Sequence, residues 1–382
     1  MAPIGFTPAK RKIFPSHLLR AELLKSLKYT EISYRKYCSD QLNDLEQKTN
    51  RAFVGLPLHK KLSISHSQLS QFRSGLSFKQ MVNLLVYVIY LFENSGRLDS
   101  EFVVHGVDST ELAITCNSRL LATIEVGKQK VRIYSDLDAD CGKRRKKRDK
   151  SEYFIGYRMH SLIAINPETG ASYPLISLIA PGNHHDSHFL SQLVFLGKAI
   201  GLELKVIIAD EAYAGTEGNE RILTEDKVTV ITAPKANVNL PEHVDKENKA
   251  VYLNNNCEVP MSYVGKTTDG YHEYKCNAVY GECIYGPVCP QYRQIPIDSG
   301  CFGQIPVHIN GLKELINLRK NIERPFNLLK HREGLEPVRV RSQQSLMVAA
   351  TFANMANLLL EIVGTRKTKS KYDRQQRFKF AA

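Results

Sequence analysis

The sequence predicts a mixed α/β fold with a helical region in front of it, and the changing spacing of its apolar residues carries that prediction. Up to about residue 100, leucines and other apolar residues recur at helical spacing. From residue 101, β-branched apolar runs alternate with helical stretches, as expected of strands and helices packed in layers. The strand-like runs are 103–115, 153–165, 172–180, 204–209 and 228–233, and the helical stretches are 187–200 and 216–224.

Between the last strand-like run and residue 311 the periodicity fades, and helical spacing then returns. This pattern predicts a module inserted into an α/β core. We therefore expect a helical N-terminal domain at 1–100, the first part of the core at 101–234, the insertion at 235–310, the C-terminal helices of the core at 311–364 and a basic tail, expected to be disordered, at 365–382.

The composition indicates a folded protein that binds a polyanion. Of the 382 residues, 43% are hydrophobic, and the formal net charge is +13 at pH 7. Clustered Lys and Arg displace the counterions around nucleic acid, so nucleic acid is the expected partner, with a membrane surface as the alternative. The longest apolar stretch, 81–92, is shorter than the roughly 20 residues that cross a bilayer, and no hydrophobic leader opens the chain. We expect a cytoplasmic protein without membrane contact.

The N-terminal region carries two helix-start signals. Ser77 opens the apolar helix at 81–92, and the segment 62–73 predicts a small helix preceded by a cap. Such a helical domain either binds DNA or serves only for packing. The basic charge of the chain favours DNA binding.

An apolar strand that ends on a carboxylate is the first candidate for chemistry. Residues 102–107 favour a buried strand, and Asp108 follows them directly. An ionised carboxylate is costly to bury without a partner, so we expect Asp108 at an open strand end, in a cleft or on a metal ion. Taken alone, a strand-terminal Asp that begins a turn is the simpler interpretation.

The same pattern recurs at 205–210, where a second β-branched strand ends on Asp210. Neighbouring strand ends can bring Asp108 and Asp210 within reach of one or two cations. Glu211 competes with Asp210, but side chains alternate along a strand and only one of the two can face the required side. Asp210 matches the earlier pattern, and we predict it as the second ligand.

A strongly basic run precedes the strand expected at 153–165. Within 143–150, seven of the eight residues are Lys or Arg, and we predict a loop there. Such a run is ordinarily a solvated face, but its position beside a core strand favours an edge that follows DNA phosphates. The predicted phosphate contacts are Lys143, Arg144, Arg145, Lys146, Lys147 and Arg148.

The insertion holds five of the eight cysteines. A reducing cytosol makes disulfides unexpected, which leaves metal binding or simple burial. Zinc prefers four thiolate or imidazole ligands at short paired spacings, and the spacings here are looser, so a structural zinc ribbon and free thiols are equal alternatives. The predicted zinc ligands are Cys257, Cys276, Cys283 and Cys289, with Cys301, His272 and His308 as competitors.

Beyond the insertion, apolar residues recur at steps of three and four and describe one helix face. They are Leu315, Leu318, Ile322, Phe326 and Leu329. Arg319, Glu323 and Lys330 lie on an adjacent face, where surface ion pairing is the simplest interpretation. Pro325 should kink or interrupt the turn before it, and Gly364 is placed to end the final helix.

Together these residues resemble the DDE transposases of bacterial insertion sequences, of the IS4-like group and of the subset with a cysteine-containing insertion. The family signature is matched by Asp108 in 107–110, by Asp210 in 209–213, and by Glu323 between Arg319 and Lys330. Three further segments resemble the family's N-terminal helical region, second core strand and the loop after the third strand, namely 69–73, 156–160 and 180–187.

The resemblance implies a ribonuclease H-like sheet and a metal-dependent chemistry. It implies Asp108, Asp210 and Glu323 as catalytic ligands of Mg²⁺ or Mn²⁺, and Arg319 and Lys330 as phosphate contacts. The implied reaction is strand cleavage at the ends of an insertion sequence, followed by strand transfer into target DNA. The implied partners are the terminal inverted repeats, target DNA and a second copy of the chain, in the cytoplasm at the nucleoid.

This chain departs from the family pattern at one position and leaves two other functions open. Relatives in the best-known branch carry Tyr three positions before the Arg, where this chain has Ile316. One alternative is a nuclease of the same fold that hydrolyses DNA without joining ends. The other is a non-catalytic DNA-binding protein derived from a transposase, against which the three carboxylates argue.

Overall fold

The computed structural model describes the N-terminal helices, most of the core and shorter pieces of the insertion. The described residues are 12–98, 103–114, 120–145, 151–213, 216–232, 244–245, 250–251, 257, 259, 261–269, 271–277, 291–296, 312–332, 334–336, 338 and 340–364. The basic tail predicted at 365–382 lies outside them.

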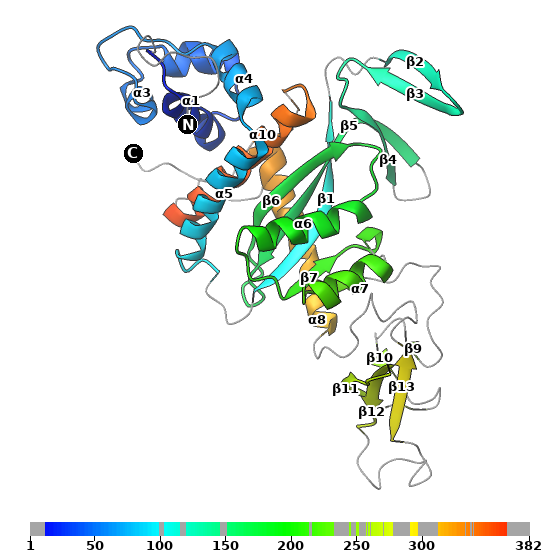
Figure 1. The fold of residues 1–382 in the computed structure, drawn as a ribbon. Coiled ribbons are helices and arrows are strands. Elements are labelled where there is room, and N and C mark those ends of the chain that lie inside the picture. Colours follow the sequence, from blue (N-terminus) through cyan, green and yellow to red (C-terminus); the bar gives the residue numbers. More distant parts are fainter. Residues whose placement is uncertain are drawn as a thin grey trace.

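Helices make up the described N-terminal region (Figure 1). The elements are α1 (Pro15–Lys28), α2 (Tyr34–Lys36), the π-helical turn η2 (Tyr37–Leu42), α3 (Lys48–Val54), α4 (His66–Gly75) and α5 (Phe78–Glu93). The hydroxyls of Ser65 and Ser77 accept hydrogen bonds from the backbone amides of Gln68 and Gln80 at the starts of α4 and α5. Both predicted helix starts are therefore confirmed, because these bonds satisfy amides that have no partner within the helix.

A buried ion pair ties the N-terminal helices together. The Arg73 Nη1 atom lies 2.7 Å from Glu22 Oε1, and the two side chains are 7% and 2% exposed. Tyr34 donates its hydroxyl proton to Glu22 over 2.8 Å, and the Arg73 guanidinium lies 4.0 Å from the centre of the Tyr34 ring. These contacts compensate two charges that would be costly to bury singly.

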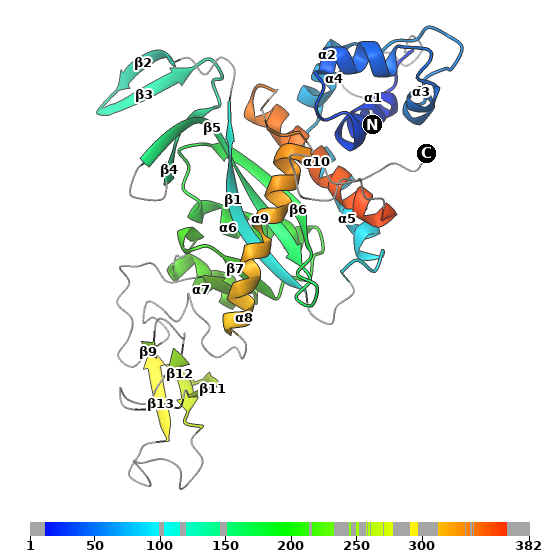
Figure 2. The same ribbon diagram turned by 180° about the vertical axis from the view of Figure 1, so that it is seen from behind.

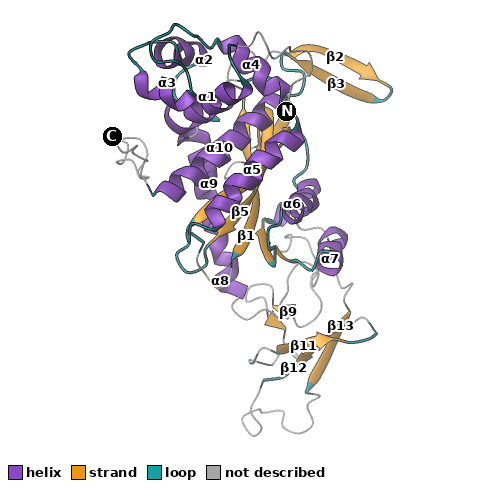
Figure 3. Cartoon of the chain, turned by 60° about the vertical axis from the view of Figure 1, so that its left-hand side comes forward, coloured by secondary structure: helices purple, strands orange, loops and turns teal. Residues whose placement is uncertain are grey.

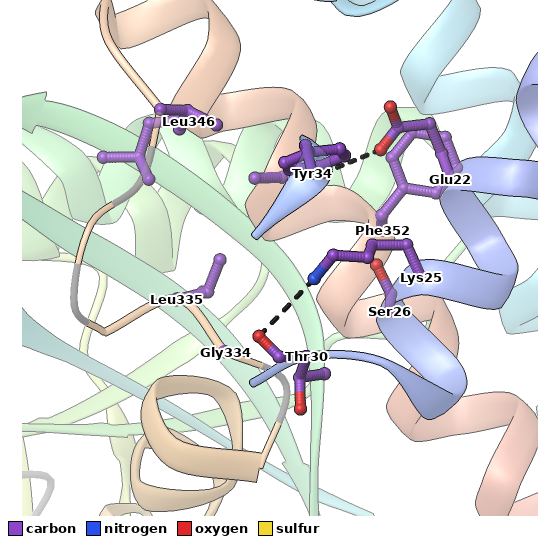
Figure 4. A pocket seen from close by; sticks show the side chains of 11 residues that line it. Glu22, Lys25, Ser26, Thr30, Tyr34, Gly334, Leu335, Leu346 and Phe352 are labelled. Atoms are coloured by element: carbon purple, nitrogen blue, oxygen red, sulfur yellow. Dashed lines mark hydrogen bonds between the residues drawn. The ribbon is translucent and has the colours of Figure 1, made fainter. Parts of the chain in front are cut away.

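The N-terminal helices pack against the C-terminal end of the chain. A small cavity of about 40 Å³ lies at this junction, and Figure 4 shows Glu22 and Lys25 on one side of it and Leu335 and Leu346 on the other. Leu346 belongs to α10 (Gln343–Val363), and Leu335 to the segment before it. The described N-terminal helices and α10 are therefore in direct contact, although they are far apart in sequence.

The core is a mixed sheet with the strand order β4-β5-β1-β7-β8, and β6 pairs with β5. Antiparallel pairs join β1 to β5 and β5 to both β4 and β6, whereas β1, β7 and β8 run parallel. This arrangement confirms the predicted mixed α/β class of the ribonuclease H-like type. The strands are β1 (Val104–Ala113), β4 (Asp140–Arg145), β5 (Ser151–Ile165), β6 (Ser172–Pro181), β7 (Val206–Ala209) and β8 (Thr229–Thr232).

Helices cover both faces of this sheet, as Figures 1 and 2 show from opposite sides. One face carries α6 (Ser187–Ala199) and α7 (Thr216–Glu225), and the other carries a helix that follows the insertion. α10 packs on β6 and against α5. Its C-terminal cap Gly364 has a φ of +68°, so the predicted end of the final helix is confirmed.

α10 is long and apolar enough to cross a membrane by length and composition, and so is the pair α4 and α5 if it is taken as one bent span. In the folded protein, however, 67% of the apolar window of α10 is buried. A core helix has the same composition, because it is surrounded by protein on all sides.

The helix after the insertion is interrupted near Pro325, and the predicted interruption is therefore confirmed. Pro325 lies in the first turn of a short helix, directly after a 3₁₀ turn. Proline has no backbone N–H to donate, and a first helical turn is where that loss costs least. The segments of this interrupted helix are α8 (Leu312–Asn317), the 3₁₀ turn η5 (Leu318–Asn321), α9 (Glu323–Asn327) and the π-helical turn η6 (Leu328–Arg332).

A glycine lets the interrupted helix approach the central strand closely. A Cβ atom added to Gly106 of β1 would lie 2.5 Å from Cδ1 and 2.7 Å from Cγ1 of Ile322, which is fully buried. Real Cβ atoms do not come this close to other carbon atoms, so a larger residue at position 106 would displace the helix. Glu323 directly follows Ile322, so this contact fixes the position of the Glu323 backbone.

The segment between β1 and β5 differs from the prediction of a loop. Lys143, Arg144 and Arg145 form the end of β4, which pairs with β5, whereas 146–150 lie outside the described residues. Charged side chains are common on edge strands, so a basic run does not exclude a strand. The predicted loop at 143–145 is therefore wrong.

The same segment contains a hairpin that the sequence did not predict, formed by β2 (Leu120–Val126) and β3 (Gln129–Tyr134). Figure 1 shows it projecting from the sheet. Ile124 lies opposite Val131 on one face, and Glu125 lies opposite Lys130 on the other. The hairpin is thus amphipathic, and every residue of β2 is exposed.

The described parts of the insertion form small antiparallel sheets, which Figure 3 shows beyond α7 and α8. Its elements are β9 (Val244–Asp245), β10 (Ala250–Val251), β11 (Ser262–Lys266), β12 (Tyr271–Lys275) and β13 (Tyr292–Pro296). Of the predicted zinc ligands, Cys257 and Cys276 are half-buried and form no disulfide among the described residues, and His272 is buried in β12. The remaining candidates, Cys283, Cys289, Cys301 and His308, lie outside the described residues.

Gly106→Val should displace the interrupted helix from β1, because the added methyl groups overlap the Ile322 side chain. We expect the free energy of unfolding to fall by about 1–3 kcal/mol, as in other overpacked cores, when measured by denaturant titration. The double variant Gly106→Val/Ile322→Ala should recover part of this loss. Gly265→Val is the control, since nothing lies within 4 Å of a Cβ added there. An unchanged stability of Gly106→Val would contradict the close approach.

Candidate active site

Asp108 and Asp210 leave the sheet on the same face. Val104, Val206 and Ile208 pack together with apolar residues of α8 and η5. Because side chains alternate along a strand, Asp108 and Asp210 continue the same rows toward the interrupted helix. The structure therefore places Asp210, rather than Glu211, beside Asp108.

In each of the two carboxylates, one oxygen accepts a hydrogen bond from the next backbone amide, and the other faces the Arg319 guanidinium. Asp108 Oδ1 accepts a hydrogen bond from the next backbone amide over 2.7 Å, and Asp210 Oδ1 does the same over 2.6 Å. The Oδ2 atoms lie 3.7 Å and 3.0 Å, respectively, from Nη2 of Arg319. The two Oδ2 atoms can therefore be no further apart than the sum of these two distances.

Burial makes Asp108 the electrostatically strained member of this pair. Its side chain is 18% exposed, against 36% for Asp210. Burial is the main reason that the pKa of Asp108 is raised from 3.8 to about 6, and the carboxylates of Asp210 and Asp186 contribute to the rise. The Ser109 amide and the Arg319 guanidinium oppose it, because both stabilise the ionised form.

The third predicted carboxylate, Glu323, is exposed at the start of α9, four positions after Arg319. Among the residues that the structure describes, no three His, Cys, Asp or Glu side chains form a group that could hold a metal ion. The structure thus brings Asp108 and Asp210 together, but it does not gather Glu323 into a metal site with them.

Two of the predicted phosphate contacts, Arg319 and Lys330, have protein partners in this structure. Arg319 contacts both aspartates, and its buried Nε atom has no hydrogen-bond partner among the described residues. Lys330 lies in η6, 3.3 Å from Glu336. In the basic run, Lys143 is exposed, the side chains of Arg144 and Arg145 are not described, and Lys146, Lys147 and Arg148 lie outside the described residues.

The carboxylate oxygens of Asp108 and Asp210 are suitable ligands for a divalent metal ion. Two carboxylate oxygens from Asp108 and Asp210 already converge on one positive charge, that of Arg319. Oxygen ligands of this kind suit hard cations such as Mg²⁺, which take few protein ligands and complete their shell with water or phosphate. The site residues therefore have the chemistry that a bound metal would require.

Behind the two aspartates lies a polar cluster that the sequence alone did not single out. His160 of β5 is fully buried, and its Nδ1 atom lies 3.1 Å from the Tyr213 hydroxyl and 3.7 Å from Asp186. Arg158 contacts Asp186 over 3.3 Å and donates to the backbone carbonyl of Lys143 over 2.8 Å. The sequence signals for these residues were the segment resemblances at 156–160 and 180–187 and, for Tyr213, the Asp210 segment at 209–213.

The His160 ring is held as a neutral group. It stacks on Phe189 of α6 with ring centres 3.9 Å apart. Burial, helped by the positive charge of Arg158, lowers the pKa of His160 to about 3. Burial also raises the pKa of Tyr213 well above its usual range, so the hydroxyl keeps its proton. His160 and Tyr213 therefore interact with each other through a hydrogen bond between neutral groups.

Comparison with known proteins connects this site with a family. The family model described as "Transposase DDE domain" matches residues 107–359, from the strand of Asp108 to α10. No curated protein matches the chain. Among solved structures, the chain is similar to a piggyBac transposase in a synaptic complex with hairpin DNA, with 9% identity, 96% of this chain and 76% of that chain covered, and a TM-score of 0.26. Similarity at this level does not bear on the fold or the function.

Asp108→Asn should stabilise the metal-free protein at pH 8. A carboxyl whose pKa is raised by folding stabilises the fold while it is protonated, and this contribution is lost as the pH rises through about 6. Since each pKa unit is worth about 1.4 kcal/mol, the neutral side chain should raise the free energy of unfolding by up to about 3 kcal/mol.

The pH dependence distinguishes this electrostatic stabilisation from one that is the same at every pH. The advantage of Asp108→Asn should shrink as the pH falls from 7 to 5, because the wild-type carboxyl then gains its proton in the folded state. Glu203→Gln, at a side chain that is 80% exposed, should change stability by less than about 0.5 kcal/mol at either pH. Equal stability of Asp108→Asn and wild type at pH 8 would show that burial does not strain this carboxyl.

Proposed function

Because this chain belongs to the family of transposases with a DDE domain, which cleave and join DNA strands, we propose that Asp108, Asp210 and Glu323 are its catalytic carboxylates. One observation carries this proposal. The Oδ2 atoms of Asp108 and Asp210 meet at Nη2 of Arg319, which stands four positions before Glu323 in the interrupted helix. Side chains from two neighbouring strands thus converge on one side chain of the helix.

Enzymes of this family generally use divalent metal ions, and we infer Mg²⁺, with Mn²⁺ as a substitute, at Asp108 and Asp210. The convergence of two hard oxygen ligands on one positive charge supports this choice. A bound ion of this type activates water or a DNA 3′-hydroxyl as the nucleophile and stabilises the leaving oxygen. The protein's own part is to hold the two carboxylates close together.

Glu323 is the member of the proposed set with the weakest support. Its side chain is exposed, and an exposed side chain can change rotamer at little cost. Its backbone is held more firmly, because the neighbouring Ile322 is buried against Gly106. We therefore infer that Glu323 completes the site by a side-chain movement, without a movement of the helix.

DNA phosphates are the proposed ligands of Arg319, Lys330 and the basic segment 143–148. Arg319 offers a planar fork that can bind phosphate at two points, whereas Lys330 acts as a point charge. Both are bound to carboxylates of the protein here, so DNA would have to exchange those contacts for its own. The exposed Lys143 lies on β4, an edge strand of the core sheet.

We further propose that the DNA is an insertion sequence of the bacterial IS4-like group. The N-terminal helices would bind its terminal inverted repeats, and two copies of the chain would bring two ends together on target DNA, in the cytoplasm at the nucleoid. The formal charge of +13 supports contact with DNA, and the family match supports the reaction. The cysteine-containing insertion is proposed to belong to the same subset of relatives.

A structural zinc ion in the insertion is a separate proposal, with Cys257, Cys276, Cys283 and Cys289 as ligands. Elemental analysis of the purified protein should find one zinc per chain, because four thiolates match the coordination that zinc prefers. Cys276→Ser should lose the metal. Cys38→Ser should keep it, because Cys38 is buried in the N-terminal helices. Protein without zinc would contradict the ribbon.

Strand cleavage and strand transfer should both depend on the three carboxylates. Asp108→Ala, Asp210→Ala and Glu323→Ala should each lower the rate with end-labelled DNA and Mg²⁺ by at least about 100-fold, since even residues that support metal ligands are worth about 10–100-fold. Products are separated by gel electrophoresis, which distinguishes hydrolysed ends from ends joined to a target.

Glu211→Ala is the matched control, because it removes a carboxylate beside Asp210 that is not part of the proposed set. It should keep activity within a few fold of wild type. Full activity of Glu323→Ala would remove Glu323 from the site, and cleavage without any joined product would indicate a nuclease.

A further inference from the structure

The backbone ladder between the two aspartate strands ends before it reaches the aspartates. β1 and β7 pair at His105 with Ile207, at Gly106 with Ile208 and at Val107 with Ala209. Asp108 and Asp210 are the next residues along each strand. The spacing of their carboxylates therefore depends on contacts other than this ladder.

The Tyr213 hydroxyl supplies such a contact on the opposite face of the sheet. It lies 3.1 Å from Nδ1 of His160 in β5. His160 faces Ser109, the residue that follows Asp108, in the antiparallel ladder of β1 and β5. One hydroxyl thus connects the turn after β7 with the strand that pairs with β1.

Tyr213 is also bonded to the backbone of Asp210. Its amide donates to the Asp210 carbonyl over 3.0 Å and closes the 3₁₀ turn η3 (Glu211–Tyr213). The side chain is 1% exposed, and it packs in the main hydrophobic core. A movement of Asp210 away from Asp108 would therefore have to pull a buried tyrosine out of its hydrogen bonds.

We propose that Tyr213 is a positioning residue, whose hydroxyl fixes the Asp210 turn against His160 and so sets the spacing of the two carboxylates. The inference rests on the proposed metal site at Asp108 and Asp210. His160 supports the hydroxyl, because its ring is stacked on Phe189 and cannot turn freely. The role resembles that of groups behind metal ligands, which orient the ligands without touching the metal.

Tyr213→Phe tests this role in the full chain, because it keeps the ring and removes only the hydroxyl. Isothermal titration calorimetry with Mn²⁺ alone should show a dissociation constant about 10-fold weaker or more. In the metal-free protein, the amides of Glu211 and Tyr213, which both donate to Asp210, should exchange hydrogen faster than in wild type. His160→Phe, which keeps a ring stacked on Phe189 and removes the partner of the hydroxyl, should produce the same two changes, and the double variant should add little to either.

Tyr37→Phe is the matched control. Tyr37 is fully buried, and its hydroxyl donates to the Ala21 carbonyl over 2.7 Å in the N-terminal helices. It should lower thermal stability without changing Mn²⁺ affinity or exchange in η3. Wild-type affinity and exchange in Tyr213→Phe would overturn the inference. If Asp108→Asn leaves Mn²⁺ binding unchanged, the proposed metal site fails, and hydrogen exchange alone then decides the role of Tyr213.

Discussion

The requirement to hold two negative charges close together in a partly buried place governs the arrangement of this site. Asp108 and Asp210 repel each other, and burial adds to the cost of ionising Asp108. Arg319 offsets this cost by contacting both carboxylates with one nitrogen. The two oxygens that contact Arg319 are also suitable ligands for a divalent metal ion. The repulsion between the carboxylates and the proposed activity therefore arise from the same pair of side chains.

The sheet separates the reactive groups from the groups that support them. Carboxylates and Arg319 lie on the face covered by the interrupted helix, whereas Ser109, Tyr213 and His160 meet on the other face. This division follows from the alternation of side chains along β1. Neighbouring residues such as Asp108 and Ser109 can therefore serve a reactive and a structural role without competing for space.

The interrupted helix brings a distant part of the chain to this sheet. Its position depends on the absence of a side chain at Gly106, over which Ile322 is buried. The 3₁₀ turn before Pro325 changes the course of the helix between Arg319 and Glu323. The long insertion between β8 and α8 is compatible with this arrangement, because the helix is held by its contacts with β1 and β6 rather than by a short connection.

Local patterns in the sequence were sufficient to predict β1 and β5 to β8, most helices and the aspartates that follow two apolar runs, because periodicity and capping act over a few residues. They did not predict β2, β3 or β4. The preference for Asp210 over Glu211 followed from the same alternation. Glu323, Arg319 and Lys330 were singled out by family resemblance, and their helical spacing alone favoured surface ion pairs. Only the tertiary structure decided that Arg319 contacts both aspartates, that Lys330 pairs with Glu336, and that Tyr213 reaches His160 across 53 positions of the chain. The Arg319 and Tyr213 contacts join residues far apart in sequence, so no local spacing records them.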